Sequence, residues 1–241
     1  MAPVSGRLYV GTSGFAFPEW KHDVFYPEGT KDREMLPYYA SRLPSVEINY
    51  TFRRSPAEKT LLTWREITPD GFLFTLKAHQ RITHTLRLRD AAEPVDIFLE
   101  RARLLGDRLG CVLFQCPPNL RFDRDLIVGF LGTLPPEVRA AFEFRHASWD
   151  EARPIVAERG FAWCEADTDE APFSRASLGD GSRTVYARLR KETYEDDDLK
   201  TWAGRFGEAL AGGADVFCYV KHEEAGAGPR YAERLAELVG S

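Results

Sequence analysis

Carboxylate and basic side chains end most of the β-strands that this sequence predicts, and together they could bind an anion and move protons. Four acids stand at or near the end of a short apolar run: Glu47, Glu143, Glu165 and Asp167. Carboxylates that converge on one site can act as general acid and base, or can ligate a divalent metal. We therefore take these four acids as catalytic candidates, with ion pairing to nearby bases as the structural alternative.

Five basic side chains follow the same pattern and favour an anionic ligand. They are Lys77, Arg145, Arg188, Arg190 and Lys221. Arg188, Arg190 and Lys221 belong to the seventh and eighth predicted strands, and many proteins built as barrels of alternating strands and helices hold a phosphate there. The planar guanidinium of arginine suits phosphate or carboxylate oxygens. Lys77 could instead act as a Schiff-base nucleophile, but an ion pair with Glu47 or Glu143 is the favoured interpretation.

Further polar and aromatic residues near the predicted strand ends complete the set of ligand-binding candidates. They are Thr12, Trp20, Asn49, Tyr50, His79, Gln115, His146 and His222. The three histidines and four acids leave room for a divalent metal, whereas five bases on the same face disfavour a metal cage. The Gly11–Gly14 turn lacks the spacing of a phosphate-binding or dinucleotide-binding loop, so we expect no nucleotide cofactor.

The elements that would position these residues are eight short strands alternating with helices. The predicted strands are Leu8–Thr12, Val46–Asn49, Leu73–Lys77, Cys111–Gln115, Ala141–Arg145, Ala162–Glu165, Val185–Arg190 and Val216–Lys221. Helical spacing of apolar residues separates most of them, as in Arg33–Leu43 and Asp196–Leu210. Strands that alternate with helices are parallel, so the pattern predicts a single (β/α)8 TIM barrel over residues 1–241. Thr168–Arg183 has no apolar stripe, and the helix after strand 6 should be weak or missing.

In a strand, residues two apart share a face, and this rule places the candidates. Read in that way, all four acids, all five bases and Thr12 point into the barrel at the carboxyl ends of the strands. Strand-to-helix loops join there, and active sites of this architecture lie on that side.

Composition bounds the class of protein. The chain has 241 residues, 44% hydrophobic and 29% charged, which is ordinary for a globular domain. A net charge of −5 means that any affinity for nucleic acid would come from a local basic patch. Four cysteines without CxxC spacing, no apolar leader in Met1–Arg7 and no long apolar segment indicate a cytoplasmic protein without membrane attachment. The oligomeric state is left open.

Several ordered motifs resemble the YecE-like family, domain of unknown function 72, over about Arg7 to Val239. They are Gly11–Gly14 with Trp20 and Phe25–Pro27, Val46–Asn49 with Thr51-Phe52, Lys77-Ala78 with Thr83-His84, Phe114-Gln115 with Pro117-Pro118, and Glu143–His146 with Ser148-Trp149. The resemblance implies a (β/α)8 barrel but no particular activity. The family usually has His-Gly after the strand-7 arginine and an Asn pair after strand 8, where this chain has Arg190-Lys191 and Lys221-His222.

The preferred hypothesis is a hydrolase acting on a phosphorylated or other anionic substrate, such as a phosphodiester. Glu47 and Glu143 would be its acid and base, with Glu165 and Asp167 as alternates. One alternative is a non-catalytic module that binds nucleic acid or a metabolite. Another is a sugar-phosphate isomerase or lyase.

Overall fold

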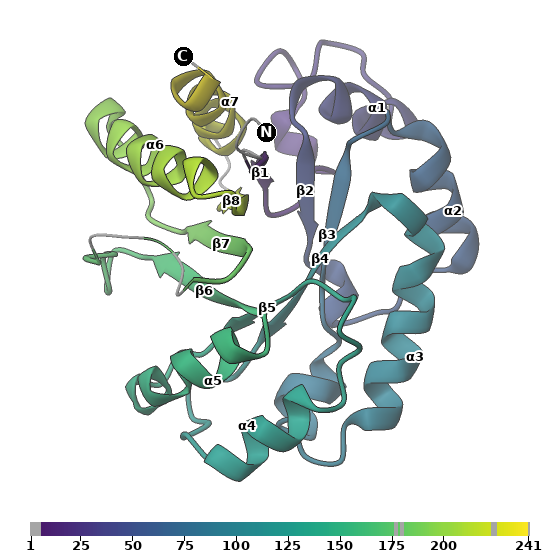
Figure 1. The fold of residues 1–241 in the computed structure, drawn as a ribbon. Helices are drawn as coiled ribbons and strands as arrows, with labels where there is room; N and C mark the ends of the chain where they lie inside the picture. Colours follow the sequence, from purple (N-terminus) through teal and green to yellow (C-terminus); the bar gives the residue numbers. More distant parts are fainter. Residues whose placement is uncertain (1–5, 176–177, 179–180, 223–225, 241) are drawn as a thin grey trace, which may run out of the picture.

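The computed structural model describes residues 6–175, 178, 181–222 and 226–240, in which eight parallel strands are surrounded by seven α-helices (Figure 1). The strands are β1 Leu8–Thr12, β2 Ser45–Ile48, β3 Leu73–Lys77, β4 Leu109–Gln115, β5 Ala140–Glu143, β6 Ala162–Asp167, β7 Thr184–Leu189 and β8 Asp215–Val220. The helices are α1 Asp32–Arg42, α2 Glu58–Ile67, α3 Ala92–Ala102, α4 Arg124–Leu131, α5 Arg153–Glu158, α6 Asp196–Ala211 and α7 Ala227–Gly240. The predicted TIM barrel is confirmed, with each strand within two residues of its expected bounds.

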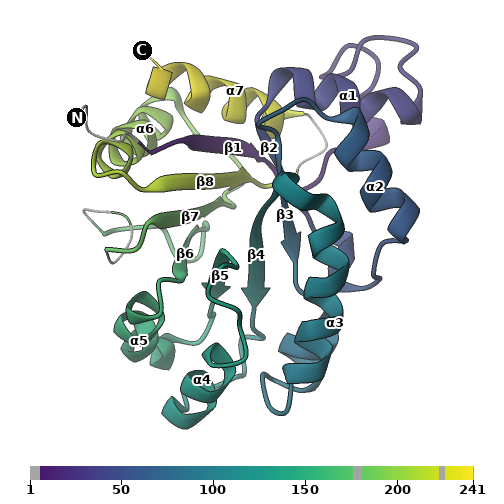
Figure 2. The same ribbon diagram turned by 45° about the vertical axis from the view of Figure 1, so that its right-hand side comes forward.

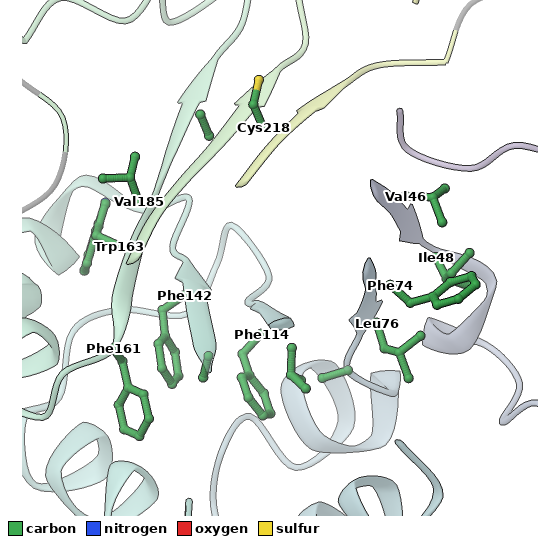
Figure 3. Close-up of a cluster of buried hydrophobic side chains, with 14 of the residues drawn as sticks. Val46, Ile48, Phe74, Leu76, Phe114, Phe142, Phe161, Trp163, Val185 and Cys218 are labelled. Carbon is green, nitrogen blue, oxygen red and sulfur yellow. The ribbon is translucent and has the colours of Figure 1, made fainter. Parts of the chain in front are cut away.

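Alternation along the strands creates two apolar layers. Side chains on the outer face, such as Val46, Phe74, Phe114 and Val185, point from the strands toward the surrounding helices (Figure 3). A smaller inner layer fills the barrel with Leu73, Cys111, Leu113, Ala141, Ala162, Cys164, Tyr186, Phe217 and Tyr219. Because the inner layer is packed, the barrel is solid below the carboxyl ends of its strands.

The barrel closes where β1 meets β2, and this seam is unlike the others. The sheet runs in the order β1-β8-β7-β6-β5-β4-β3-β2, and one parallel bridge, between Ser13 and Glu47, joins its two edges. A Cβ atom at Gly11 would lie 1.8 Å from the Ser45 carbonyl oxygen, so only glycine allows this approach. Tyr39 of α1 fastens the seam, since its hydroxyl accepts from the Thr12 amide and donates to the Ser45 carbonyl.

The connection between β6 and β7 is also unusual. Its described residues, 168–175, 178 and 181–183, contain no helix, as the sequence predicted. The turned view in Figure 2 shows β6 and β7 side by side without a helix label between them, in contrast to β3 and β4, which α3 connects. The expectation about a leader in Met1–Arg7 falls largely on residues outside the described ones. Among the described helices, none combines the length and apolar character needed to cross a membrane.

Candidate functional site

Charged side chains cap the inner apolar layer at the carboxyl ends of the strands, a region called the mouth below. Seven of the predicted residues share the inner face with the apolar layer, by strand alternation: Glu47, Lys77, Glu143, Arg145, Arg188, Arg190 and Lys221. Gln115 of β4 joins them and is buried. The strand period therefore brings both signs of charge together in one place.

Arg188 of β7 links the two carboxylates of the mouth. Its Nη2 donates to Glu47 Oε1 at 2.8 Å, and its Nη1 donates to Glu143 Oε2 at 2.5 Å. The side chains of Arg188, Glu47 and Glu143 are 3%, 0% and 6% exposed. This buried group of three, which we call the Arg188 triad, spans the barrel from β2 to β5, and its charges have little access to water.

Glu47 is saturated with donors. Besides Arg188, its Oε1 accepts from Ser13 Oγ at 2.8 Å and from Asn49 Nδ2 at 3.1 Å, and its Oε2 accepts from the Tyr186 hydroxyl at 2.5 Å. Burial opposes the ionised form, but Arg188 and Arg190 together with these donors hold the pKa of Glu47 below its usual range. Glu47 is therefore a fixed anion near neutral pH.

Glu143 is held in a similar way. Its Oε1 accepts from Gln115 Nε2 at 2.8 Å and from Arg145 Nε at 3.0 Å. Burial again favours the neutral acid, yet the positive charges of Arg188 and Arg145 prevail and lower the pKa of Glu143 to about 2. Neither carboxyl of the mouth carries a proton near neutral pH.

Replacing Tyr186 with phenylalanine removes one donor to Glu47 without changing the ring. Hydrogen bonds to charged groups are worth about 1.5–3 kcal/mol, and we expect the free energy of unfolding to fall by that amount in chemical denaturation. The control is Tyr9→Phe on the same inner layer, because the structure records no hydrogen bond for that hydroxyl among the described residues. Equal losses in both variants would contradict the role given to Tyr186.

Two of the four predicted acids lie outside the mouth, which corrects the sequence-based placement. Glu165 and Asp167 share the outer face of β6 with Trp163. The Arg153 guanidinium of α5 donates to both Glu165 oxygens, at 2.9 and 3.2 Å. Asp167 accepts from the Trp202 indole and the Phe173 amide and pairs with Lys191 at 3.4 Å. The helical layer supplies partners for polar groups, so these acids do not need to point inward.

Thr12 is the third residue predicted for the inner face and found on the outer one. Its amide donates to Tyr39, and its hydroxyl donates to the Gly14 carbonyl at 2.6 Å. The next residue, Ser13, takes the inward position instead and contacts Glu47 and Arg190. Sequence reasoning missed Ser13 and Tyr186. The frame Tyr9-Gly11-Ser13 would have found the serine, because the frame that contains Thr12 also holds the aliphatic Leu8 and Val10.

The remaining candidates lie around the mouth rather than in it. Trp20 is fully buried against Phe17 and Phe25, so its side chain packs inside the loop between β1 and α1. Tyr50 is 45% exposed and packs edge-on against Trp64.

The histidines are dispersed. His79 accepts from the Arg81 amide at a separate groove that Pro94 and Phe98 also line. His146 bonds to Ser148 in the loop after β5. His222 stacks on Phe17, with ring centres 3.6 Å apart, and lies 2.7 Å from Glu19. The described residues hold no group of three or more His, Cys, Asp or Glu side chains placed to bind a metal.

Four cations of the mouth remain after the triad is formed, and they differ in their contacts. Arg145 uses its Nε for Glu143, and Arg190 donates through Nη1 to Ser13 Oγ at 2.9 Å. Burial and the neighbouring Arg188 charge lower the pKa of Arg190. Within the described residues, no carboxylate lies in ion-pair range of Arg190, Lys77 or Lys221. The ion pair expected between Lys77 and Glu47 or Glu143 is therefore absent, since Arg188 occupies both acids.

A cleft of about 700 Å³ connects the mouth to the helical layer. It opens because β5 and β6 pair only at Ala141–Ala162 and Phe142–Trp163 and then separate. Glu143, Arg145 and Arg190 line its inner part, and Phe173 with other residues of the β6–β7 connection lines its outer part. The volume is within the range of small-molecule sites. A ligand in the cleft would contact Arg145 and Arg190, which line it.

Comparison with known proteins supplies the family context. The family model described as "Protein of unknown function DUF72" matches residues 9–241. The UPF0759 protein YecE of Escherichia coli is 33% identical over 141 residues, which cover 58% of this chain and 48% of that protein. The match thus spans about half the length of that relative. The UPF0759 protein YunF of Bacillus subtilis is 29% identical over 216 residues, covering 82% of this chain and 70% of YunF.

Solved structures agree with the barrel. The crystal structure of a DUF72 family protein from Thermotoga maritima superimposes with a TM-score of 0.77 and 25% identity, covering 98% of this chain and all of that one. A DUF72 family protein from Enterococcus faecalis superimposes with a TM-score of 0.74 at 15% identity, covering 97% of this chain and 96% of that one. The second likeness concerns the fold alone.

Proposed function

Because the chain belongs to the DUF72 family, whose TIM-barrel fold it shares and whose description names no activity, we propose from its own residues that it is an enzyme acting on a small anionic substrate at the mouth. Phosphorylated or carboxylated molecules are the substrate class. Arg190, Lys221 and the outer part of Arg145 would hold the anionic group, and the cleft would hold the rest of the molecule.

The charge balance of the mouth carries this proposal. Five cationic side chains face two carboxylates there, so three positive charges are in excess. Arg188 binds both carboxylates, and Arg145 also donates to Glu143 through Nε. Arg190 is half-buried with a hydroxyl as its recorded side-chain partner, and such a guanidinium gains most from an anion that accepts its remaining N–H groups.

The reaction class follows from which group can move a proton. The hydrolase hypothesis gave that role to Glu47 and Glu143, but the pKa of Glu47 is below its usual range and that of Glu143 is about 2, so both are poor acids and bases near neutral pH. We therefore assign both glutamates to positioning Arg188. Lys77 is the mouth group whose pKa, lowered to about 8, suits proton transfer. This favours an isomerase or lyase acting on a sugar phosphate over a carboxylate-driven hydrolase.

Replacing Arg190 with methionine tests the anion site. We expect isothermal titration with inorganic phosphate to show binding to the wild type and at least about a tenfold weaker Kd in Arg190→Met, equivalent to about 1.4 kcal/mol. The control is Arg139→Met at the opposite end of the barrel, where Arg139 pairs with Asp215 at 3.1 Å. Wild-type protein that binds neither phosphate nor sulfate would refute the proposal, as would equal affinities in both variants.

Turnover separates the reaction classes. Release of phosphate from p-nitrophenyl phosphate or from its diester would support a hydrolase. Conversion of an aldose phosphate to a ketose phosphate or to smaller fragments, without phosphate release, would support the isomerase or lyase. Salt-dependent binding of phosphorylated compounds with no product from any of them would indicate a binding module.

A further inference from the structure

Lys77 stands at a reactive position in the mouth. It is the last residue of β3, and its side chain shares the inner face with Leu73 and Thr75. Thr75 is tied to Tyr219 by a 2.7 Å hydrogen bond, and the Lys77 carbonyl accepts from Thr51 at 2.6 Å. The backbone that carries Lys77 is thus fixed by its neighbours, so the amine is presented from a rigid element.

The surroundings of the amine are enclosed and rich in positive charge. Nζ lies 4.3 Å from the centre of the Phe52 ring, which covers one side of it. The charged and titratable groups that face it are Glu47 of β2, His84 of the turn after β3, Glu143 of β5, Arg145 just after β5, and Arg188 of β7. Since Arg188 binds both glutamates, no carboxylate forms an ion pair with Lys77 in the described chain.

This environment increases the fraction of uncharged amine relative to an ordinary lysine. Burial, followed by the positive charge of Arg188, lowers the pKa of Lys77 to about 8. A neutral lysine amine is a nucleophile toward carbonyl carbon, whereas an ordinary lysine is almost fully protonated near neutral pH. The ion-paired lysines of the chain offer no such group, as in Lys21 with Asp32 and Lys191 with Asp167.

We propose that Lys77 forms an imine with a small aldehyde or ketone that also carries a phosphate or carboxylate, an inference that rests on the anion site proposed above. The fold puts an amine and an anion-binding set in the same mouth. Arg190 and Lys221, which directly follow β7 and β8, would hold the anionic end while the carbonyl carbon meets Nζ of Lys77.

The reaction balances without a further reactant. The Nζ lone pair attacks the carbonyl carbon, and the π electrons of the C=O bond move to oxygen, which takes up one proton from the attacking nitrogen. The nitrogen lone pair of the resulting carbinolamine then forms the C=N bond, and the hydroxyl leaves as water with the second nitrogen proton. Amine and carbonyl compound give imine and water, and the protonated imine withdraws electrons from the neighbouring carbon.

Pyridoxal 5′-phosphate is a suitable probe because it combines an aldehyde with a phosphate. We expect it to form an imine with the wild type, seen by absorbance, that borohydride reduces to a stable amine. Peptide mapping by mass spectrometry should place the label on Lys77. Lys77→Arg keeps the charge but cannot form an imine, so labelling should fall at least tenfold, whereas Lys191→Arg at the rim should label as the wild type does.

Two further comparisons connect the amine to the anion site. Saturating inorganic phosphate should reduce labelling of Lys77 severalfold, and pyridoxal, which lacks the phosphate, should label it severalfold less. Labelling should rise as the pH is raised through about 8, following the pKa of the amine. Mapping in the wild type keeps the test valid even if Lys77→Arg does not fold.

The outcomes separate the two proposals. Phosphate binding by calorimetry with label spread over surface lysines would overturn the imine and leave the anion site standing. Selective labelling of Lys77 that neither phosphate nor the Arg190→Met substitution affects would leave the amine reactive but overturn the anionic substrate. Selective, phosphate-sensitive labelling of Lys77 supports both.

Discussion

Arg188→Met is expected to lower the free energy of unfolding by about 3–5 kcal/mol, the usual cost of removing one partner from a buried ion pair. The arginine bridges Glu47 and Glu143, and all three side chains are at most 6% exposed. Methionine fills much of the volume but leaves two ionised carboxylates buried without their main cation. Urea denaturation at neutral pH, followed by circular dichroism, measures the loss.

Matched variants distinguish this burial effect from simple loss of an ion pair. Arg234→Met removes an arginine paired with Asp196 at 2.8 Å on the surface, where its side chain is 38% exposed. That loss should be much the smaller one, because water and salt screen an exposed pair. The triple variant Glu47→Gln/Arg188→Met/Glu143→Gln removes the orphaned charges and should recover part of the stability. Equal losses for Arg188→Met and Arg234→Met would show that the triad is not an energetic unit.

The architecture and most of the mouth could be predicted because the relevant strands have unambiguous neighbours. Val46 and Ile48 flank Glu47, and Ala187 and Leu189 flank Arg188 of β7. In these strands one face is wholly apolar, so the polar residues have only the inner face left. Strands of this kind gave the correct inward positions for Glu47, Lys77, Glu143 and Arg188.

Strand β6 shows why the same rule fails elsewhere. Its alternating sets are Ala162 with Cys164, and Trp163 with Glu165 and Asp167. The period of two is respected, but it does not say which set points inward. Parallel barrel strands are covered on both faces, so a polar side chain can be satisfied outside when a helix supplies a partner. Arg153 of α5 is that partner for Glu165, and the sequence of β6 alone does not indicate that α5 supplies it.

The sequence also does not predict which acid forms an ion pair with which base. The strand pattern correctly indicated several acids and bases at one end of the barrel, and an ion pair for Lys77 was a reasonable expectation. The structure gives both glutamates to Arg188, whose two terminal nitrogens reach opposite sides of the barrel at once. A lysine has one nitrogen and cannot bridge in that way. The Lys77 amine therefore forms no ion pair with either glutamate, and the imine proposal depends on this feature.

Acid should weaken the fold through Glu143, and the effect can be isolated by substitution. The folded-state pKa is about 2, against an ordinary value of 4.5. Because the folded value is the lower one, the carboxylate stabilises the fold above a pH of about 4.5, and this contribution disappears as the pH falls toward about 2. The difference between the two values corresponds to about 3 kcal/mol.

Comparing the wild type with Glu143→Gln cancels the contribution of the titrating groups that lie away from the mouth. We expect the variant to be less stable near neutral pH and the gap between the two proteins to narrow in acid, by about 1–1.5 kcal/mol between pH values of about 6 and 3.5. Urea unfolding across that interval measures the gap. Glutamine has no proton to gain, so its own curve should be flatter than that of the wild type. A stability difference that stays constant with pH would mean that Glu143 has the same pKa in the folded and unfolded chain. The Arg188 triad would then not hold Glu143 ionised, and Glu143 would again be a candidate proton donor in the mouth.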